Sequence, residues 1–343
     1  MKIKTFLKLC KEFKYYKRIV KEYRHELSNG RYYMYPCMRA LCKNSERLYY
    51  DKYFNNKVSN AKFVPFVRLF NRFFRVKVCT KQLEKKYSAI YIANNTDESR
   101  EIKLFDRENN VLKIYCADLQ SYHKKMDEVQ TLEPFFRLVP SFDFDVKSKS
   151  FLQKMINIES KRPDERFVLN EIIQSGTTLP ILGQVEIKDA IIQAQQYVSV
   201  FPELAFVLDR IKEKTPKTIP ATISHGDLST DNFLYGNIGQ EENSLYWIDW
   251  EHLDTRLFFY DFYFYILNNA VRGNNFEPYY EFINHPNIVA PLFQHFQFAY
   301  SEENAKHTFL LFMLFFLLER VLPTKSQKAF EIYYSFIEGF LLK

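Results

Sequence analysis

Residues 223–232 have the sequence ISHGDLSTDN, and residues 245–251 have the sequence LYWIDWE. The first segment places a carboxylate, Asp227, five residues before an amide, Asn232, and the second ends an apolar run with Asp249. Phosphoryl transfer needs a carboxylate that orients the attacking hydroxyl and accepts its proton. It also needs hard oxygen ligands that hold Mg²⁺ on the nucleotide phosphates. These three side chains can supply both, so the two segments predict phosphoryl-transfer chemistry.

The spacing within residues 225–232 is that of the kinase catalytic loop, His-Arg-Asp-Leu followed four residues later by Asn. With Gly in place of Arg, and with IDWE at residues 248–251, the sequence resembles the aminoglycoside phosphotransferase and choline kinase-like family of small-molecule kinases. The resemblance extends over roughly residues 87–343. It implies the protein-kinase-like fold, a nucleotide (ATP or GTP) and Mg²⁺.

Matching this sequence to the family's motifs implies roles for five residues. Asp227 resembles the catalytic aspartate, and Asn232 and Asp249 resemble the metal ligands. His225 is then a structural residue that orients the loop. Asp261 resembles the downstream aspartate that braces this loop in the family.

Periodicity upstream of these motifs predicts a small antiparallel sheet with one inserted helix. Alternating apolar residues and turn residues favour strands at 88–93, 101–105, 111–115, 142–146 and 151–156, with a helix at 121–132. Beyond residue 163 the pattern is mostly helical, with the clearest helices expected at 188–214, 258–268, 308–322 and 328–342. The predicted fold is therefore α+β, with a sheet lobe and a larger helical lobe.

The sheet lobe contains candidates for nucleotide binding. Lys113 lies on the third predicted strand and Glu128 on the helix that follows. The resemblance implies that this lysine holds the α- and β-phosphates and that the glutamate pairs with it; Glu133 is the competing partner. The adenine hinge is expected after the fifth strand, at residues 155–158, with candidate residues Met155, Ile156 and Ile158.

One feature of the family pattern is missing. No glycine occurs between Gly30 and Gly176. The sheet lobe therefore has no Gly-rich loop over the phosphates. The turn between the first two predicted strands instead carries Asp97 and Glu98, whose charges suit a phosphate poorly.

The charge of the chain is divided unevenly. Residues 1–90 hold 23 Lys and Arg against six Asp and Glu, whereas residues 91–343 hold 25 against 35, and the net charge is +7. We therefore expect a basic, aromatic extension at 1–86, a sheet domain at 87–158 and a helical domain at 159–343. A basic amphipathic helix is expected at 5–27, and a second basic, aromatic stretch covers 63–74.

Three interpretations of the extension remain open. It can pack on the catalytic lobes with a solvated basic face. It can attach the protein to an anionic membrane surface or to a lipid-linked glycan. It can also bind nucleic acid through basic and aromatic side chains, which is the least favoured interpretation.

The composition suggests a cytoplasmic protein, with peripheral attachment to the membrane as an extension of that prediction. The five cysteines match no zinc pattern, no apolar run reaches the length of a membrane span, and no signal peptide is expected. The expected function is Mg²⁺-dependent phosphoryl transfer from ATP or GTP to a hydroxyl of a sugar or lipid-linked saccharide. The alternatives are an amino-alcohol or aminoglycoside acceptor, and a catalytically weak kinase-like scaffold whose extension binds a membrane or nucleic acid.

Overall fold

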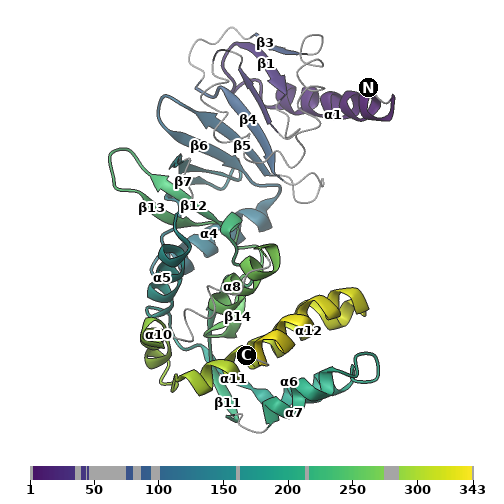
Figure 1. Cartoon of the computed structure of the whole chain (residues 1–343). Coiled ribbons are helices and arrows are strands. Elements are labelled where there is room, and N and C mark those ends of the chain that lie inside the picture. Colours follow the sequence, from purple (N-terminus) through teal and green to yellow (C-terminus); the bar gives the residue numbers. More distant parts are fainter. Residues whose placement is uncertain are drawn as a thin grey trace. The chain divides into compact units, whose positions relative to one another are not determined.

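The computed structural model describes residues 3–34, 40–43, 45, 75–79, 86–93, 101–159, 163–212, 216–273 and 286–341. The chain forms two compact units (Figure 1). The first comprises Met1–Arg162 and Leu234–Trp247, and the second comprises Pro163–Phe233 and Ile248–Lys343.

The first unit is built on an antiparallel sheet of eight strands. Its order is β3-β1-β2-β4-β5-β6-β8-β7, and the helix α4 (Leu119–Leu132) connects β6 to β7. The strands are β1 (Gly30–Met34), β2 (Ala40–Lys43), β3 (Val76–Val78), β4 (Ala89–Ala93), β5 (Glu101–Asp106), β6 (Val111–Tyr115), β7 (Ser141–Asp145) and β8 (Ser150–Lys154). The five strands and the helix expected from periodicity are confirmed in their predicted order.

The N-terminal segment is part of this sheet. Strand β2 pairs with β4, and β1 joins β2 to β3, so three strands from residues 30–78 extend the sheet at one edge. Residues 1–86 therefore do not form a separate appendage, and the division expected at residue 87 lies inside a compact unit. The basic, aromatic stretch at 63–74 lies outside the described residues.

Register fixes which side chains share a face of the sheet, because directly paired residues of an antiparallel sheet project to the same side. One row runs from Ile90 through Leu104 and Lys113 to Leu152. Neighbouring rows alternate, so Lys103 and its partner Ile114 face the opposite side.

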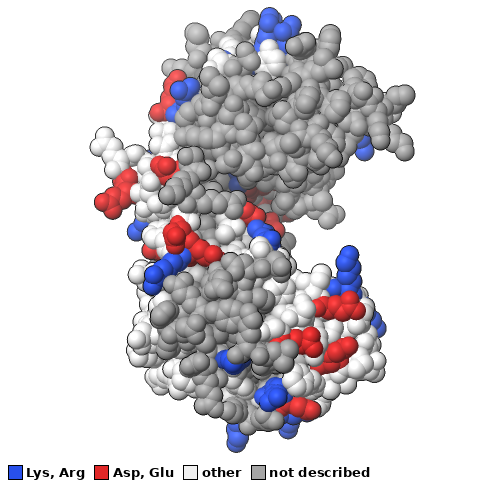
Figure 2. Space-filling view, in the orientation of Figure 1, with Lys and Arg blue, Asp and Glu red and all other residues white. Residues whose placement is uncertain are grey.

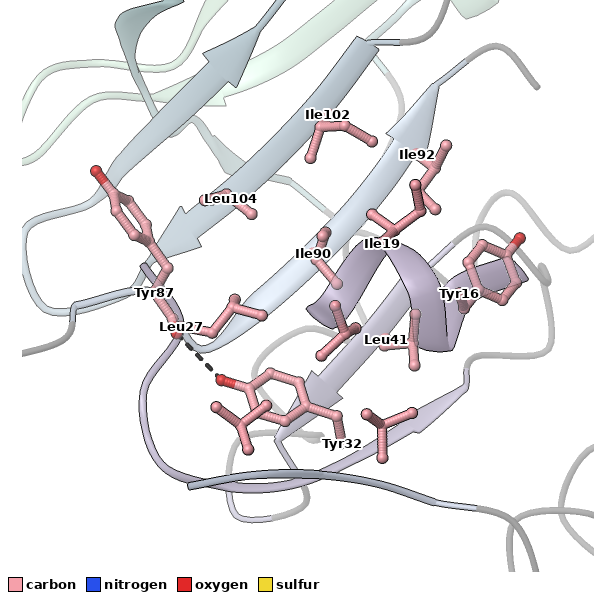
Figure 3. Packing of buried hydrophobic residues seen from close by; sticks show 13 residues of the cluster. Tyr16, Ile19, Leu27, Tyr32, Leu41, Tyr87, Ile90, Ile92, Ile102 and Leu104 are labelled. Atoms are coloured by element: carbon pink, nitrogen blue, oxygen red, sulfur yellow. Dashed lines mark hydrogen bonds between the residues drawn. The ribbon is translucent and has the colours of Figure 1, made fainter. Parts of the chain in front are cut away.

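Helix α1 (Ile3–Glu22) covers the face that carries Ile90 and Leu104. Tyr16, Ile19 and Val20 of the helix are buried against these strand residues, as Figure 3 shows for Tyr16 and Ile19. The predicted amphipathic helix is thus present, but it ends at Glu22, whereas we expected it to continue to residue 27.

Helix α4 lies on the other face. Ile114 pairs with Phe151, the Phe151 ring stacks on Phe144 at 5.2 Å, and Phe144 contacts Tyr122 of α4. Among the described residues of this unit, helices α1 and α4 therefore cover opposite sides of the sheet.

The second unit is mostly helical. Its described helices are α5 (Glu165–Gly176), α6 (Ile187–Gln195), α7 (Leu204–Lys212), α8 (Tyr260–Gly273), α10 (Ala290–His295), α11 (Glu302–Phe316) and α12 (Gln327–Leu341). A small sheet of β10 (Gly183–Glu186), β11 (Thr218–Ser224) and β14 (Asp254–Leu257) is set among them. The predicted two-lobed α+β class is confirmed.

One predicted helix is divided in two. The pattern at 188–214 indicated a single helix, but α6 ends at Gln195 and α7 begins at Leu204. Pro202 lies between them, and its ring cannot continue the hydrogen bonding of a helix. Among the described residues, no helix is both long and apolar enough to cross a bilayer.

Candidate active site

The segment carrying Asp227 leaves the C-terminal end of β11 and is clasped by one carboxylate. Asp261, at the start of α8, accepts hydrogen bonds from the Ser224 hydroxyl (2.8 Å) and from the backbone N–H groups of His225 (2.7 Å) and Gly226 (2.9 Å). Three donors from consecutive residues fix the backbone immediately before Asp227. Asp261 therefore makes the contacts that we expect of a residue that braces this loop.

His225 connects this loop to the segment that carries Asp249. The imidazole is fully buried, its Nε2 lies 2.9 Å from the Ile248 carbonyl oxygen, and its ring packs on Trp250 at 4.6 Å. A carbonyl oxygen can only accept, so Nε2 carries the proton. The arrangement agrees with a structural role for this histidine.

Asn232 lies in the short helix η4 (Thr230–Asn232) and closes the loop. Its side-chain amide donates to the Asp227 carbonyl (3.0 Å), and its Oδ1 accepts from the Ser229 hydroxyl (3.1 Å). Its own carbonyl accepts from the Ile248 N–H at 3.0 Å. Asn232 is thereby tied both to Asp227 and to the residue that precedes Asp249.

Asp249 has a left-handed backbone conformation, with φ +68°, and is exposed. This conformation is uncommon outside glycine and is tolerated best by Asn and Asp. It follows β13 (Ser244–Trp247), as the sequence predicts for a side chain presented at the end of an apolar strand.

The donor chemistry of Asn232 and Asp249 fits Mg²⁺. Mg²⁺ binds oxygen ligands, keeps several waters and is usually held by one or two carboxylates together with substrate phosphates. The described residues contain no group of three His, Cys, Asp or Glu side chains that could hold a metal without such help. One carboxylate and one amide on linked loops therefore suit an ion that arrives with a nucleotide.

Lys113 has a different partner from the one we expected. Its ammonium lies 2.8 Å from a carboxylate oxygen of Glu26, which follows α1, and the Tyr115 hydroxyl donates to the same oxygen. Burial alone would raise the pKa of Glu26, but the hydrogen bonds from Lys113 and Tyr115 outweigh it and hold the pKa below its usual value.

Glu128 instead pairs with its own helix, with Lys125 at 3.0 Å and Lys124 at 4.0 Å. The expected pairing of Glu128 with Lys113 is wrong in this structure, and sheet geometry gives the reason. Lys113 projects to the face covered by α1, whereas α4 packs on the other face, towards which Lys103 projects. Glu133, the competing partner, is the C-cap of α4 on that same helix.

The expected adenine hinge connects β8 to β9 (Asn157–Ile158). Met155 and Ile156 are buried, and the Met155 N–H donates to the Asn110 carbonyl at 2.8 Å. Ile158 pairs with Gly236 of β12 (Phe233–Asn237). Adenine binding by these residues stays a prediction, and the turn with Asp97 and Glu98 lies outside the described residues.

Sequence reasoning missed two charged residues that contact the candidate site residues. Glu26 forms an ion pair with Lys113. Arg320 forms an ion pair with Asp227 and donates a hydrogen bond to the Gly226 carbonyl. Each is distant in sequence from its partner, and no local spacing indicates either contact. Only the sheet register and the helix packing bring them together.

No family model and no curated protein matches this chain. Solved structures that resemble it include an aminoglycoside 2'-phosphotransferase-IIIa in complex with GDP, at 13% identity and a TM-score of 0.44, covering 82% of this chain and 98% of that one. A choline kinase from Streptococcus pneumoniae matches at 13% identity and a TM-score of 0.41, covering 73% and 92%. A macrolide 2'-phosphotransferase type I matches at 14% identity and a TM-score of 0.38, and the match covers 71% of this chain and 89% of that one.

Proposed function

We propose that this protein is a Mg²⁺-dependent phosphotransferase that uses ATP or GTP to phosphorylate a hydroxyl group. The observation that carries the proposal is the loop in which Asp227 and Asn232 are joined by a hydrogen bond and tied, through Ile248, to Asp249. The Asn232 amide, the exposed Asp249 carboxylate and the partly exposed Asp227 carboxylate are thus carried by segments that hydrogen bonds join.

In the proposed reaction, the Asp227 carboxylate orients the acceptor hydroxyl and takes its proton. The acceptor oxygen forms a bond to the γ-phosphorus, and the bond from that phosphorus to the bridging oxygen breaks, releasing the nucleoside diphosphate. Asn232 and Asp249 would hold Mg²⁺, which supplies charge neutralisation on the phosphates. Most of the acceleration then comes from positioning and electrostatic stabilisation.

Lys113 is the proposed ligand of the α- and β-phosphates, held by Glu26. The Glu26 contact keeps the ammonium in a defined position, and the lysine side chain is partly exposed. Lys103 on the opposite face, which pairs with Glu101 at 3.0 Å, is the matched control for this assignment.

The proposed acceptor is a sugar or a lipid-linked saccharide, and α1 supports a location at an anionic surface. Among the side chains of this helix that the structure describes, the exposed basic ones are Lys11, Lys14, Lys17, Arg18 and Lys21. Its apolar side is buried in the sheet core, so attachment would be electrostatic and would not insert the helix among lipid tails.

The test begins with nucleotide binding, measured as a shift in Tm on adding Mg²⁺-ATP or Mg²⁺-GTP to the full chain. We expect at least one of them to stabilise the protein, with a shift that grows with the logarithm of its concentration above the Kd. Phosphate transfer to a neutral monosaccharide, a lipid-linked saccharide, choline and kanamycin then ranks the acceptor classes. A protein that binds neither nucleotide would favour the scaffold hypothesis.

A further inference from the structure

The C-terminal part of the second unit contains a π-helical turn, η6 (Leu317–Val321), between α11 and a short 3₁₀ segment. Pro323 explains why regular helix fails here, because its nitrogen has no N–H to donate to the carbonyl of residue 319. Such turns are rare and often occur at functional sites. This one presents two consecutive charged residues, Glu319 and Arg320.

Arg320 reaches the loop that carries Asp227. Its Nη2 donates to the Gly226 carbonyl at 2.8 Å, and its Nη1 lies 3.8 Å from Oδ1 of Asp227. The guanidinium also lies over the Phe264 ring, 5.9 Å from its centre. One cation therefore contacts both the backbone before Asp227 and the Asp227 carboxylate.

Arg320 is itself held by a charged network. Glu319 lies 3.5 Å from Nε of Arg320 and accepts hydrogen bonds from Arg256 (2.7 Å) and from the Tyr260 hydroxyl (2.9 Å). Burial would raise the pKa of Glu319, but the hydrogen bonds from Arg256 and Tyr260 and the charges of Arg256 and Arg320 together outweigh it and lower the pKa. Arg256 also donates to the His252 carbonyl, so the network is anchored beyond Asp249.

We propose that Arg320 is a positioning residue for Asp227. Residues 223–232 contain no Lys or Arg, so the cation at this carboxylate comes from the C-terminal helices instead of from the loop itself. Arg320 engages Oδ1 and the preceding carbonyl, which fixes the rotamer and leaves Oδ2 to meet the hydroxyl. The inference rests on the proposed function of Asp227 and adds a distant residue to its site.

The experiment compares Arg320→Gln, Arg320→Lys and the wild type in hydrolysis of Mg²⁺-ATP and Mg²⁺-GTP, with water as the acceptor. Arg320→Gln should lower kcat by about 100-fold, which is the loss expected when a catalytic group is misplaced by about 1 Å. The KM for nucleotide should stay within about twofold of the wild-type value, because Arg320 has no proposed contact with the nucleotide. Arg320→Lys keeps the charge and should recover part of kcat. Arg210→Gln is the matched control, because Arg210 likewise lies over a ring, Phe206, at 5.3 Å.

The outcomes separate this inference from the proposed function. If the wild type hydrolyses nucleotide and Arg320→Gln matches it, the role of Arg320 is refuted while the function stands. If Arg320→Gln and Arg320→Lys lose activity equally and together with Tm, the residue is structural and the inference also fails. If the wild type neither binds nor hydrolyses nucleotide, the proposed function falls and the inference falls with it.

Discussion

Gly226 shows how one residue constrains the loop. Its φ is +76°, and an added Cβ would lie 2.4 Å from Nη1 of Arg256 and 2.5 Å from the His252 carbonyl oxygen. Two separate causes therefore disfavour a side chain at this position: the left-handed backbone conformation and the close neighbouring atoms. A glycine between His225 and Asp227 thus has a physical cause in this fold.

Gly226→Ala should lower the free energy of unfolding by about 2–5 kcal/mol, since it combines left-handed strain with overpacking. Gly239→Ala is the control, because Gly239 also has a positive φ (+67°) but nothing within 4 Å of an added Cβ. That control should lose only the conformational part, about 1–2 kcal/mol. Urea unfolding measures both, and equal losses would show that crowding at Gly226 does not matter.

The ion-pair partner of Lys113 could not be predicted from the sequence. The strand of Lys113 and the following helix were predicted correctly, but strand periodicity alone does not say which helix covers which face. That depends on α1, whose side chains bury Leu104 beside Lys113. The contact between Asn232 and Asp227 was accessible from sequence because the two residues are only five apart, whereas the contact of Arg320 with Asp227 was not.

Glu26→Gln should weaken nucleotide binding by about tenfold, because it removes a charged partner from Lys113. Glu128→Gln, which breaks pairs within α4 only, should change the affinity less than twofold. Isothermal titration of Mg²⁺-ATP against each variant measures the difference. The reverse order would place the phosphate-binding lysine on the α4 face, and Lys103→Met would then be the variant that abolishes binding.

At the scale of elements, α1 is a structural part of the sheet unit. Its spacing of apolar residues predicted an amphipathic helix, yet the same pattern suits a membrane surface and a protein core. The structure distinguishes them, since Tyr16 and Ile19 pack against strand residues in Figure 3, and Val20 belongs to the same buried cluster. The apolar side of the helix is occupied.

Ile19→Ala should therefore destabilise the protein by about 2–5 kcal/mol, the cost of truncating a fully buried side chain. Leu7→Ala, on the same helix but 60% exposed, should change stability by no more than about 0.5 kcal/mol. Thermal unfolding of the full chain separates the two. If Ile19→Ala leaves Tm unchanged but abolishes vesicle binding, the helix serves the membrane and not the core.

At the scale of the whole molecule, the uneven charge persists in the folded protein. The exposed side of α1 is basic, whereas the described surface of the second unit in Figure 2 mixes Asp and Glu with Lys and Arg. The sequence predicted this division of charge. It could not predict that the basic segment is joined to the sheet by strand pairing, because pairing between distant segments leaves no local signal.

Binding to vesicles containing anionic lipid should fall as salt rises, because the attraction is screened. Replacing Lys14, Lys17 and Lys21 with Gln should weaken it about 100-fold, at roughly 1 kcal/mol for each charge. Exposed lysines of the second unit, Lys188, Lys212 and Lys328, provide the control triple substitution. Equal effects of the two triple variants would mean that α1 is not the contact surface.

The central claim, that Asp227 orients the acceptor on a Mg²⁺-nucleotide site, is tested most directly by one comparison. Nucleotide affinity and Mg²⁺-dependent hydrolysis of ATP and GTP are measured for the wild type and Asp227→Ala. We expect affinity within about threefold and a loss in kcat of roughly 1,000-fold or more, since removal of a catalytic base leaves nucleotide contacts intact. Unchanged hydrolysis in Asp227→Ala, or loss of nucleotide binding with the fold preserved, would contradict the account.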